Sequence, residues 1–225
     1  AWDDSSNGFK SIPGDGEYSV RDDAEYLHYT SNNTLFGTQF NHLPDSNGKP
    51  RVVDASSDIC GAHLDVSKHD LIYAGAQKNL GPSGVTVVIL SPWAASRGKE
   101  GLPTMLDYQT HISKGSMFNT PNTYGIFVLD KVLSWVERNG GLDGAIRRNQ
   151  KKSGLIYDML DGSDFWRPHA EVGSRSMMNV TWRLADEGLE DVFLSEAMDS
   201  GMGGLKGHRS VGGLRASLYN GCPVE

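Results

Sequence analysis

The sequence predicts an α/β protein in which a mainly parallel sheet packs against helices. Residues 71–73 and 85–90 are short, continuous runs of apolar and β-branched residues, which is the composition of strands buried in a sheet. Between residues 126 and 136 the apolar residues recur at helical spacing, and Asn-Gly-Gly at 139–141 is a typical end for a helix. Strands and helices are therefore expected to follow one another along the chain, as in α/β folds.

The pattern after this helix predicts a second, smaller α/β unit. A helix is expected over 142–160, a strand over 176–184 and a further helix over 190–200, before a last strand. We therefore divide the chain into a larger domain, 1–140, and a small C-terminal α/β domain, 141–225.

Local signals predict the remaining elements. Residues 1–25 are polar with no periodic apolar face, which indicates a surface segment, and 26–30 is a short strand candidate. The segment 91–113 contains two prolines and two glycines and is expected to be irregular. The helix over 142–160 is expected to bury Ile146, Leu155, Ile156 and Met159 and to expose Arg147, Arg148, Lys151 and Lys152.

The composition argues against several classes of function. The 225 residues carry a net charge of −7 without a basic stripe, so nucleic-acid binding is not expected. There is no apolar run long enough to span a bilayer and no signal-peptide pattern, so we expect no membrane insertion, and no metal site either. Cys60 and Cys222 are the two cysteines, and so few thiols in a chain of this length indicate a reduced, cytoplasmic protein.

Lys78 is the first candidate for a chemical role, because it lies in a turn that follows the 71–73 run. Burial at the end of a strand disfavours the charged ammonium, and a lowered pKa is what makes an amine a nucleophile. Two interpretations fit: a lysine that forms a Schiff base with pyridoxal phosphate, or a lysine that packs its stem at the strand end and keeps its ammonium in water. Position alone favours the second, so the neighbouring residues must decide.

Asp54 supports the cofactor interpretation. It ends the short apolar run 51–53, and parallel strands would bring Asp54 and Lys78 to the same carboxyl edge, where open α/β sheets bind ligands. An ionised carboxylate beside the ring nitrogen of pyridoxal phosphate keeps that nitrogen protonated, and the cofactor needs this proton to act as an electron sink. Asp54 and Lys78 are therefore the candidate cofactor pair, with Lys78 as the catalytic residue.

Six stretches along the chain match one known family. They are His-Tyr-Thr-Ser-Asn-Asn-Thr at 28–34, Asp-Val-Ser-Lys at 65–68, Ala-Gly-Ala-Gln-Lys-Asn at 74–79, Phe-Asn-Thr-Pro at 118–121, Met-Asn-Val at 178–180 and Leu-Lys-Gly-His-Arg-Ser-Val-Gly-Gly-Leu-Arg-Ala-Ser-Leu-Tyr-Asn at 205–220. With these stretches the chain resembles the phosphoserine aminotransferase family, in the class V group of fold-type-I enzymes that depend on pyridoxal phosphate. The resemblance implies that 1–140 is part of the large cofactor-binding domain of that fold.

The resemblance assigns cofactor contacts to four more residues. It implies that Thr34 lies near the ring hydroxyl and that Gln77 also binds the cofactor. Without the resemblance, Thr34 also fits a structural threonine in an Asn-rich turn. Asn119 and Thr120 precede the helix expected from residue 126, where small polar side chains suit a phosphate or a helix cap. The resemblance implies that Asn119 and Thr120 contact the cofactor phosphate of a partner subunit, and therefore that the protein is a homodimer with shared active sites.

A second charged cluster lies near the C-terminus. Arg209 and Arg215 are six residues apart, so along one extended strand they would point to the same face, with His208 beside them. Two guanidinium groups on one face suit a ligand with two acidic groups, and an exposed basic strand is the simpler alternative. The resemblance assigns Arg215 to the α-carboxylate of the amino acid, and His208 with Arg209 to its phosphate or second carboxylate.

The resemblance implies an aminotransferase of serine biosynthesis. It would take an amino group from glutamate, giving 2-oxoglutarate, and pass it to 3-phosphohydroxypyruvate, giving O-phosphoserine. The amine of Lys78 would move the proton between the substrate α-carbon and the cofactor C4′ carbon. Two alternatives stay open: another class V aminotransferase with a different substrate, and a catalytically silent chain.

The resemblance also predicts that the chain is a fragment. The family has a region before the equivalent of residue 1 that supplies the loop around the cofactor phosphate, an aromatic residue stacked on the pyridine ring and another substrate arginine. It also has a C-terminal helix after the equivalent of residues 219–223. Without these segments we expect exposed strand edges and apolar surface.

Overall fold

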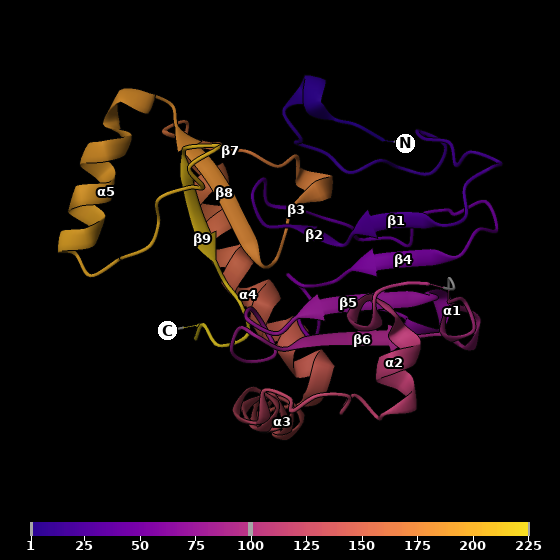
Figure 1. The fold of residues 1–225 in the computed structure, drawn as a ribbon. Coiled ribbons are helices and arrows are strands. Elements are labelled where there is room, and N and C mark those ends of the chain that lie inside the picture. Colours follow the sequence, from indigo (N-terminus) through magenta and orange to yellow (C-terminus); the bar gives the residue numbers. More distant parts are fainter. Residues whose placement is uncertain (1, 99–100, 225) are drawn as a thin grey trace.

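The structure is a computed structural model, and it describes residues 2–98 and 101–224 of the chain. Its first sheet has four strands, in the order β1 (Leu27–Thr30), β4 (Arg51–Asp54), β5 (Leu71–Gly75) and β6 (Thr86–Leu90). β1, β4 and β5 are parallel, and β6 runs antiparallel to β5 (Figure 1). The α/β fold with a mainly parallel sheet, predicted from the sequence, is confirmed.

The apolar runs 71–73 and 85–90, which form most of β5 and β6, differ in the burial of their side chains. In β5 the side chains of Ile72 and Ala74 are buried and pack into the core of the sheet. β6 lies at the edge of the sheet, and its residues Thr86 and Ile89 are exposed. The expectation that the run 85–90 fills a fully buried sheet was therefore wrong for β6, because an edge strand has a neighbour on one side only.

A short hairpin connects this sheet to the rest of the molecule. It consists of β2 (Asn32–Asn33) and β3 (Thr38–Gln39), which pair in antiparallel register. In Figure 1 the hairpin lies between the four-stranded sheet and the C-terminal strands. Asn32 Nδ2 donates a hydrogen bond of 2.9 Å to Asn179 Oδ1, so a buried amide pair joins the two parts.

The C-terminal half forms a three-stranded antiparallel sheet. Its strands are β7 (Trp166–Pro168), β8 (Asn179–Leu184) and β9 (Leu214–Ser217), in that order. One face packs against helices in a core that contains Val180, Trp182, Leu184, Leu214 and Leu160. Each fully buried leucine contributes about 1.5–3 kcal/mol of hydrophobic stabilisation. β8 starts later than the predicted residue 176, and β7 had not been predicted.

The described residues form five α-helices beside the sheets. They are α1 (Pro92–Ala95), α2 (Tyr108–Ser113), α3 (Thr123–Arg138), α4 (Gly141–Asp161) and α5 (Glu190–Asp199), with 3-10 turns η1 (Ser5–Asn7), η2 (Val66–Lys68), η3 (Thr104–Leu106), η4 (Val172–Ser174) and η5 (Glu187–Leu189). The three longer helices confirm the sequence predictions. The segment 91–113 was wrongly expected to be irregular, since Ser91 and Asp107 cap α1 and α2 with side-chain hydrogen bonds. None of the helices that the structure describes is long and apolar enough to cross a membrane.

The buried face of α4 differs from the prediction. Leu155 and Met159 are largely exposed, whereas Lys152 is only 5% exposed. Lys152 Nζ donates hydrogen bonds to the carbonyl oxygens of three residues, Leu218 at 2.7 Å, Tyr219 at 2.9 Å and Cys222 at 3.1 Å. Lys152 was expected on the solvent face, but the chain after β9 covers it and supplies the acceptors.

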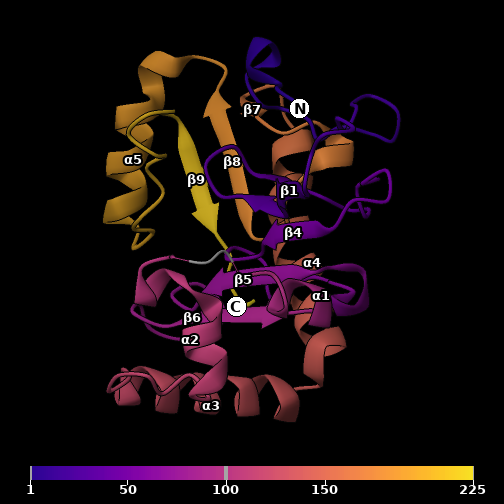
Figure 2. The same cartoon turned by 45° about the vertical axis from the view of Figure 1, so that its right-hand side comes forward.

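The domain division near residue 140 stays a prediction. Helix α4 contacts both α3 and β7, so it belongs to neither unit alone. The first residues of the chain also pack on the C-terminal half, because Glu171 N donates to Lys10 O at 2.9 Å and Ile12 N donates to Ser174 Oγ at 3.0 Å. In Figure 2, α3 lies at the bottom of the molecule, away from the three-stranded sheet.

Candidate active site at the ends of strands β4 and β5

Lys78 lies in the turn that follows β5, and its side chain is half-buried. Its Nζ donates hydrogen bonds to Thr34 Oγ1 at 2.7 Å and to Ser57 Oγ at 2.5 Å. The two hydroxyl oxygens are themselves 2.6 Å apart. The amine is thus held inside a triangle of polar groups, and this geometry does not fit an ammonium that extends freely into water.

The surroundings lower the pKa of Lys78 below its ordinary value of 10.5. Burial is the largest cause, because desolvation disfavours the charged amine. Asp54 and Asp58 act against this shift, while the positive charge of Arg215 strengthens it. A lower pKa increases the fraction of neutral amine, which is the nucleophilic form.

Asp54 ends β4 at the edge where β5 leads to Lys78. β4 and β5 are parallel, and Asp54 pairs with Tyr73 in the register of the two strands. Asp54 Oδ1 accepts a hydrogen bond of 2.9 Å from the backbone nitrogen of Ser56. Within the described part of the chain, no ion pair joins Asp54 to Lys78. The structure therefore places both residues at one edge, as the sequence predicted, with the carboxylate beside the amine and not bound to it.

Thr34 reaches Lys78 because the β2–β3 loop is fixed to the second sheet. Thr181 Oγ1, on β8, donates a hydrogen bond of 2.8 Å to Phe36 O in this loop. Gly37 has a φ of +70° and lies so close to β8 that an added Cβ would be 2.6 Å from Asn179 O. A glycine is required there for both reasons. The contact between Thr34 and Lys78 thus depends on how the two sheets are joined.

Gln77 precedes Lys78 but points elsewhere. Its side chain is exposed and folds back over β5, where a Cβ added to Gly75 would be 2.6 Å from Gln77 Oε1. The hydrogen bonds of the described residues include none from Gln77 to Lys78, Thr34 or Ser57. The cofactor role of Gln77 stays a prediction.

Arg215 lies on β9 and faces the same site. Its Nη1 lies 3.5 Å from Thr34 O, at the long limit of a hydrogen bond. β9 pairs Arg215 with Thr181 of β8, the residue that holds the Thr34 loop. Lys78, Thr34 and Arg215 therefore meet at one place although they come from three separate segments.

His208 and Arg209 are not arranged as the sequence reasoning expected. β9 begins only at Leu214, and the preceding residues turn back in a hairpin closed by Gly207 N donating to Gly213 O at 2.8 Å. Arg209 lies exposed in this turn, so the prediction that one extended strand directs Arg209 and Arg215 to one face was wrong. The physical reason is the Gly212–Gly213 pair, with φ of +77° and +67°, which reverses the chain.

A cavity of about 300 Å³ opens beside Arg215 on this face of the three-stranded sheet. Arg183 and Arg215 share the face, because Arg215 pairs with Thr181, which lies two residues before Arg183 on β8. A pair of arginines on one face had been expected, but Arg183 takes the place of Arg209. The basic residues that line the cavity are Lys10, Arg167, His169, Arg183, His208 and Arg215.

Asn119 and Thr120 lie in an exposed loop before α3. Asn119 Nδ2 donates to Thr120 O at 3.1 Å, and the cap of the helix is Asn122, whose Oδ1 accepts from Gly125 N at 3.0 Å. The simpler interpretation of Asn119 and Thr120 as helix caps was therefore wrong. Among the hydrogen bonds of the described residues none links them to Lys78, and their role in a partner's site stays a prediction.

Ser57 was missed as a residue of the Lys78 cluster, and the neighbouring Asp58 is bound to Ser31 and Gln39 and not to Lys78. Ser57 is buried and accepts a hydrogen bond from Lys78, while the carboxylate of Asp58 accepts bonds from Ser31 Oγ and, at 3.0 Å, from Gln39 Nε2. Burial raises the pKa of Asp58, although these hydrogen bonds oppose the shift. The available signal for Ser57 was its position just after Asp54, at the carboxyl end of a parallel strand.

This donor set fits the cofactor that the sequence resemblance implies. Lys78 offers an amine that can react with an aldehyde, Asp54 a carboxylate for a protonated ring nitrogen, and Arg215 a guanidinium for a carboxylate. Across residues 2–98 and 101–224 we find no group of three His, Cys, Asp or Glu side chains placed to hold a metal ion. The site is thus suited to the chemistry of an amine and an aldehyde.

Comparison with known proteins finds curated relatives of similar sequence. The phosphoserine aminotransferase of Lysinibacillus sphaericus (strain C3-41) is 50% identical over 220 residues, which cover 97% of this chain and 61% of that protein. The one from Geobacillus kaustophilus (strain HTA426) is 55% identical over 203 residues, or 90% of this chain and 56% of that protein. This chain therefore spans about three fifths of the length of these curated relatives.

Solved structures show the same similarity. The phosphoserine aminotransferase from Bacillus circulans subsp. alkalophilus has a TM-score of 0.94 and 48% identity, over 98% of this chain and 61% of that one. The phosphoserine aminotransferase with bound pyridoxal phosphate from Trichomonas vaginalis has a TM-score of 0.90 and 30% identity, over 97% and 62%. The family model of class-V aminotransferases matches residues 12–225. The resemblance found in the sequence is confirmed, and the chain belongs to the class-V aminotransferase family.

Proposed function

We propose that the protein is a pyridoxal-phosphate-dependent phosphoserine aminotransferase of serine biosynthesis. It moves an amino group from glutamate to 3-phosphohydroxypyruvate and releases 2-oxoglutarate and O-phosphoserine. The observation that carries this proposal is the half-buried Lys78, whose Nζ is held by Thr34 and Ser57 beside Asp54 and Arg215. Relatives of that name at 50% identity support this reaction over that of another class V aminotransferase.

Each residue of the Lys78 cluster has a role in this reaction. Pyridoxal phosphate, when bound, supplies an electron sink for the α-carbon of the amino acid. Lys78 Nζ holds the aldehyde carbon of the cofactor, and after its release it carries the proton between the substrate α-carbon and C4′. Asp54 would keep the ring nitrogen protonated, Thr34 would hold the ring hydroxyl, and Gln77 would also bind the cofactor.

Arg215 and the basic cavity select the substrate. Arg215 lies next to the Lys78 cluster and binds the α-carboxylate, which brings the α-carbon within reach of the amine. His208 lines the cavity and, with Arg209 beside it, binds the second acidic group of the substrate. A basic cavity favours substrates with two anionic groups, such as 3-phosphohydroxypyruvate and glutamate.

Two copies of the chain form a homodimer with shared active sites. Among the described residues, no hydrogen bond links Asn119 or Thr120 to Lys78 of the same chain. In the dimer both residues bind the cofactor phosphate of the partner. Apolar side chains between residues 105 and 127 are exposed, which supports an interface with a second copy. These are Met105, Leu106, Ile112, Met117, Phe118, Tyr124, Ile126 and Phe127.

The shared site can be tested by mixing two inactive proteins. Lys78→Ala lacks the amine but keeps Asn119 and Thr120, and Thr120→Val has the opposite defect. If the sites are shared, mixed dimers contain one intact site and regain activity, whereas neither protein does so alone. A mixture that stays inactive while light scattering shows dimers would contradict the shared site.

We propose that the protein acts in the cytoplasm on small molecules. Cys60 is half-buried and Cys222 is exposed, and both are free thiols. Unpaired cysteines support a reducing compartment. Labelling both thiols with a maleimide in freshly lysed cells tests this location, and an oxidised pair would contradict it.

Trapping the cofactor on Lys78 tests the enzyme class. The protein is incubated with pyridoxal phosphate and reduced with borohydride, and mass spectrometry locates the pyridoxyl group. We expect it on Lys78, while Lys78→Ala loses it and the exposed control Lys68→Ala keeps it. A folded protein that shows no label would support the catalytically silent alternative. Activity with O-phosphoserine but not with serine would distinguish this reaction from that of another class V enzyme.

A further inference from the structure

The hairpin turn 207–213 forms one wall of the basic cavity. Gly207, His208, Val211 and Gly212 line the cavity together with Arg215. The turn holds itself together by bonds from Val211 N and Gly212 N to His208 O, at 2.9 and 2.8 Å. These bonds fix the shape of the turn. Its base is tied to β9, where Arg215 N donates to Leu205 O at 2.8 Å, but none of these backbone bonds joins the tip of the turn to β8.

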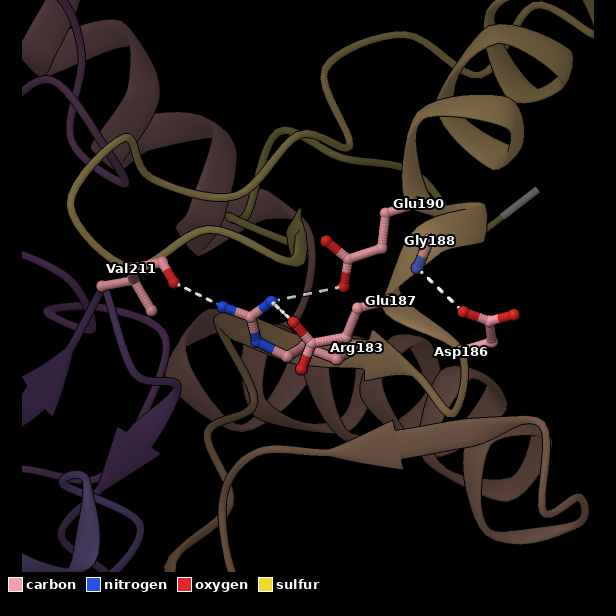
Figure 3. Close-up of polar contacts among 6 residues, drawn as sticks. All are labelled: Arg183, Asp186, Glu187, Gly188, Glu190 and Val211. Carbon is pink, nitrogen blue, oxygen red and sulfur yellow. Dashed lines mark hydrogen bonds and ion pairs between the residues drawn. The ribbon is translucent and has the colours of Figure 1, made fainter.

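Arg183 ties the tip of the turn to β8. Its Nη2 donates a hydrogen bond of 2.7 Å to Val211 O, as Figure 3 shows. Among the hydrogen bonds of the described chain, it is the one side chain from outside the hairpin that binds the backbone of residues 207–212. The position of His208 over the cavity thus depends on the guanidinium of Arg183 together with the backbone bonds at the base of the hairpin.

Two carboxylates hold this guanidinium in place. Arg183 Nη1 lies 2.8 Å from Glu187 Oε2 and 3.6 Å from Glu190 Oε1. Figure 3 shows both carboxylates on the side of Arg183 away from Val211. The turn that carries Glu187 is itself capped, because Asp186 Oδ1 accepts from Gly188 N at 2.9 Å. With its charge balanced in this way, Arg183 is suited to support the hairpin and not to bind an anion itself.

The hairpin also packs directly on the side chain of Arg183. A Cβ added to Gly212 would be 3.0 Å from Arg183 Nη2, and one added to Gly213 would be 3.1 Å from Arg183 Cγ and 2.9 Å from Trp182 O. The absence of side chains at both positions lets the turn lie against β8. The contact is therefore built from both sides, by an anchored arginine and by two glycines.

We propose that Arg183 is a positioning residue for the binding of the second acidic group of the substrate. It fixes the 207–213 turn against β8, so that His208 faces the cavity next to Arg215. This inference rests on the proposed function, in which His208 contacts the substrate phosphate. It adds a residue that touches neither substrate nor cofactor but sets the affinity for the phosphate.

The test compares Arg183→Ala and Arg183→Lys with Arg175→Ala in the protein loaded with pyridoxal phosphate. Arg175 is a matched control, because it pairs with Asp161 at 2.6 Å and lies outside the hairpin. We expect Arg183→Ala to raise KM for O-phosphoserine about tenfold, as expected for the loss of a hydrogen bond to a charged group, with kcat and the cofactor absorbance little changed. Arg183→Lys, which can reach the carbonyl but cannot also hold both carboxylates, should be intermediate.

Limited trypsin digestion supplies a second readout at Arg209. Loosening of the turn by Arg183→Ala should speed cleavage after Arg209, and O-phosphoserine should protect this bond in the wild type. A raised KM with unchanged cleavage would mean that Arg183 binds the phosphate directly, which overturns the positioning role. Unchanged KM and cleavage would overturn it as well. A wild type that neither uses nor is protected by O-phosphoserine would instead contradict the proposed function itself.

Discussion

Lys78 Nζ lies 2.7 Å from Thr34 Oγ1, although the two residues are held by different sheets. Lys78 follows β5 of the four-stranded sheet, whereas the loop of Thr34 is bound to β8 through Thr181. Arg215, which also acts on the pKa of Lys78, belongs to the second sheet as well. The reactivity of the amine therefore depends on the packing between the sheets and not on β5 alone.

Charge changes on the two sides of Lys78 should shift its pKa in opposite directions. Arg215→Gln removes a positive charge that lowers the pKa and should raise it, whereas Asp54→Asn removes a negative charge that raises the pKa and should lower it further. Both shifts are measured from the pH dependence with which an amine-reactive reagent labels Lys78, with mass spectrometry as the readout. Asp130→Asn on α3 is the control. Shifts of the same sign in both variants would contradict this electrostatic account.

Gly37→Ala should displace the Thr34 loop from β8. The new Cβ would meet Asn179 O at 2.6 Å and Thr181 Oγ1 at 2.7 Å, and φ is +70°. We expect the free energy of unfolding to fall by about 3 kcal/mol or more and the labelling of Lys78 to change. Gly48→Ala is the matched control, since Gly48 has a φ of +73° with open space around it and should lose about 1–2 kcal/mol. Equal losses in urea denaturation would show that the close approach to β8 has no effect.

The part of the site that could be predicted from the sequence is the part formed by neighbouring parallel strands. Asp54 and Lys78 each follow a short apolar run, and parallel pairing brings such ends to one edge. Thr34 and Arg215 were found by resemblance, because no local pattern shows that two sheets will meet there. Ser57 was visible as a hydroxyl near Asp54, but its bond to Lys78 depends on the turn geometry after β5.

The spacing of residues along a strand or helix did not predict which face a side chain occupies where the chain leaves that element or is covered by another segment. Arg209 and Arg215 would share a face on one strand, but the Gly212–Gly213 pair reverses the chain between them. The extent of α4 was predicted correctly but its buried face was not, because the helical pattern could not show that the segment after β9 covers Lys152. The first case is a local reversal at two glycines, whereas the second depends on a contact between residues far apart in the sequence.

Stability should fall as the pH drops below 6.5, because burial lowers the pKa of His69 and His169 below that ordinary value. The unfolded chain then binds these protons before the folded chain does, so protonation favours unfolding until the pH reaches the folded pKa values. Urea denaturation between roughly pH 8 and pH 5 measures the slope. His169→Gln keeps a donor for Gly8 O and should flatten it, whereas exposed His63→Gln should not. A slope that is the same in all three proteins would exclude His169 as its source.

Lys152→Met should destabilise the protein, although the sequence pattern placed Lys152 on a solvent face. The substitution keeps the length of the side chain but leaves three backbone carbonyls, those of Leu218, Tyr219 and Cys222, without their charged donor. Such a loss should cost about 3 kcal/mol. It should also release the segment after β9, so amide hydrogen exchange there should accelerate. The neighbouring Lys151 is exposed, and Lys151→Met should change neither quantity. If both variants unfold at the same urea concentration, the carbonyl contacts of Lys152 do not stabilise the fold.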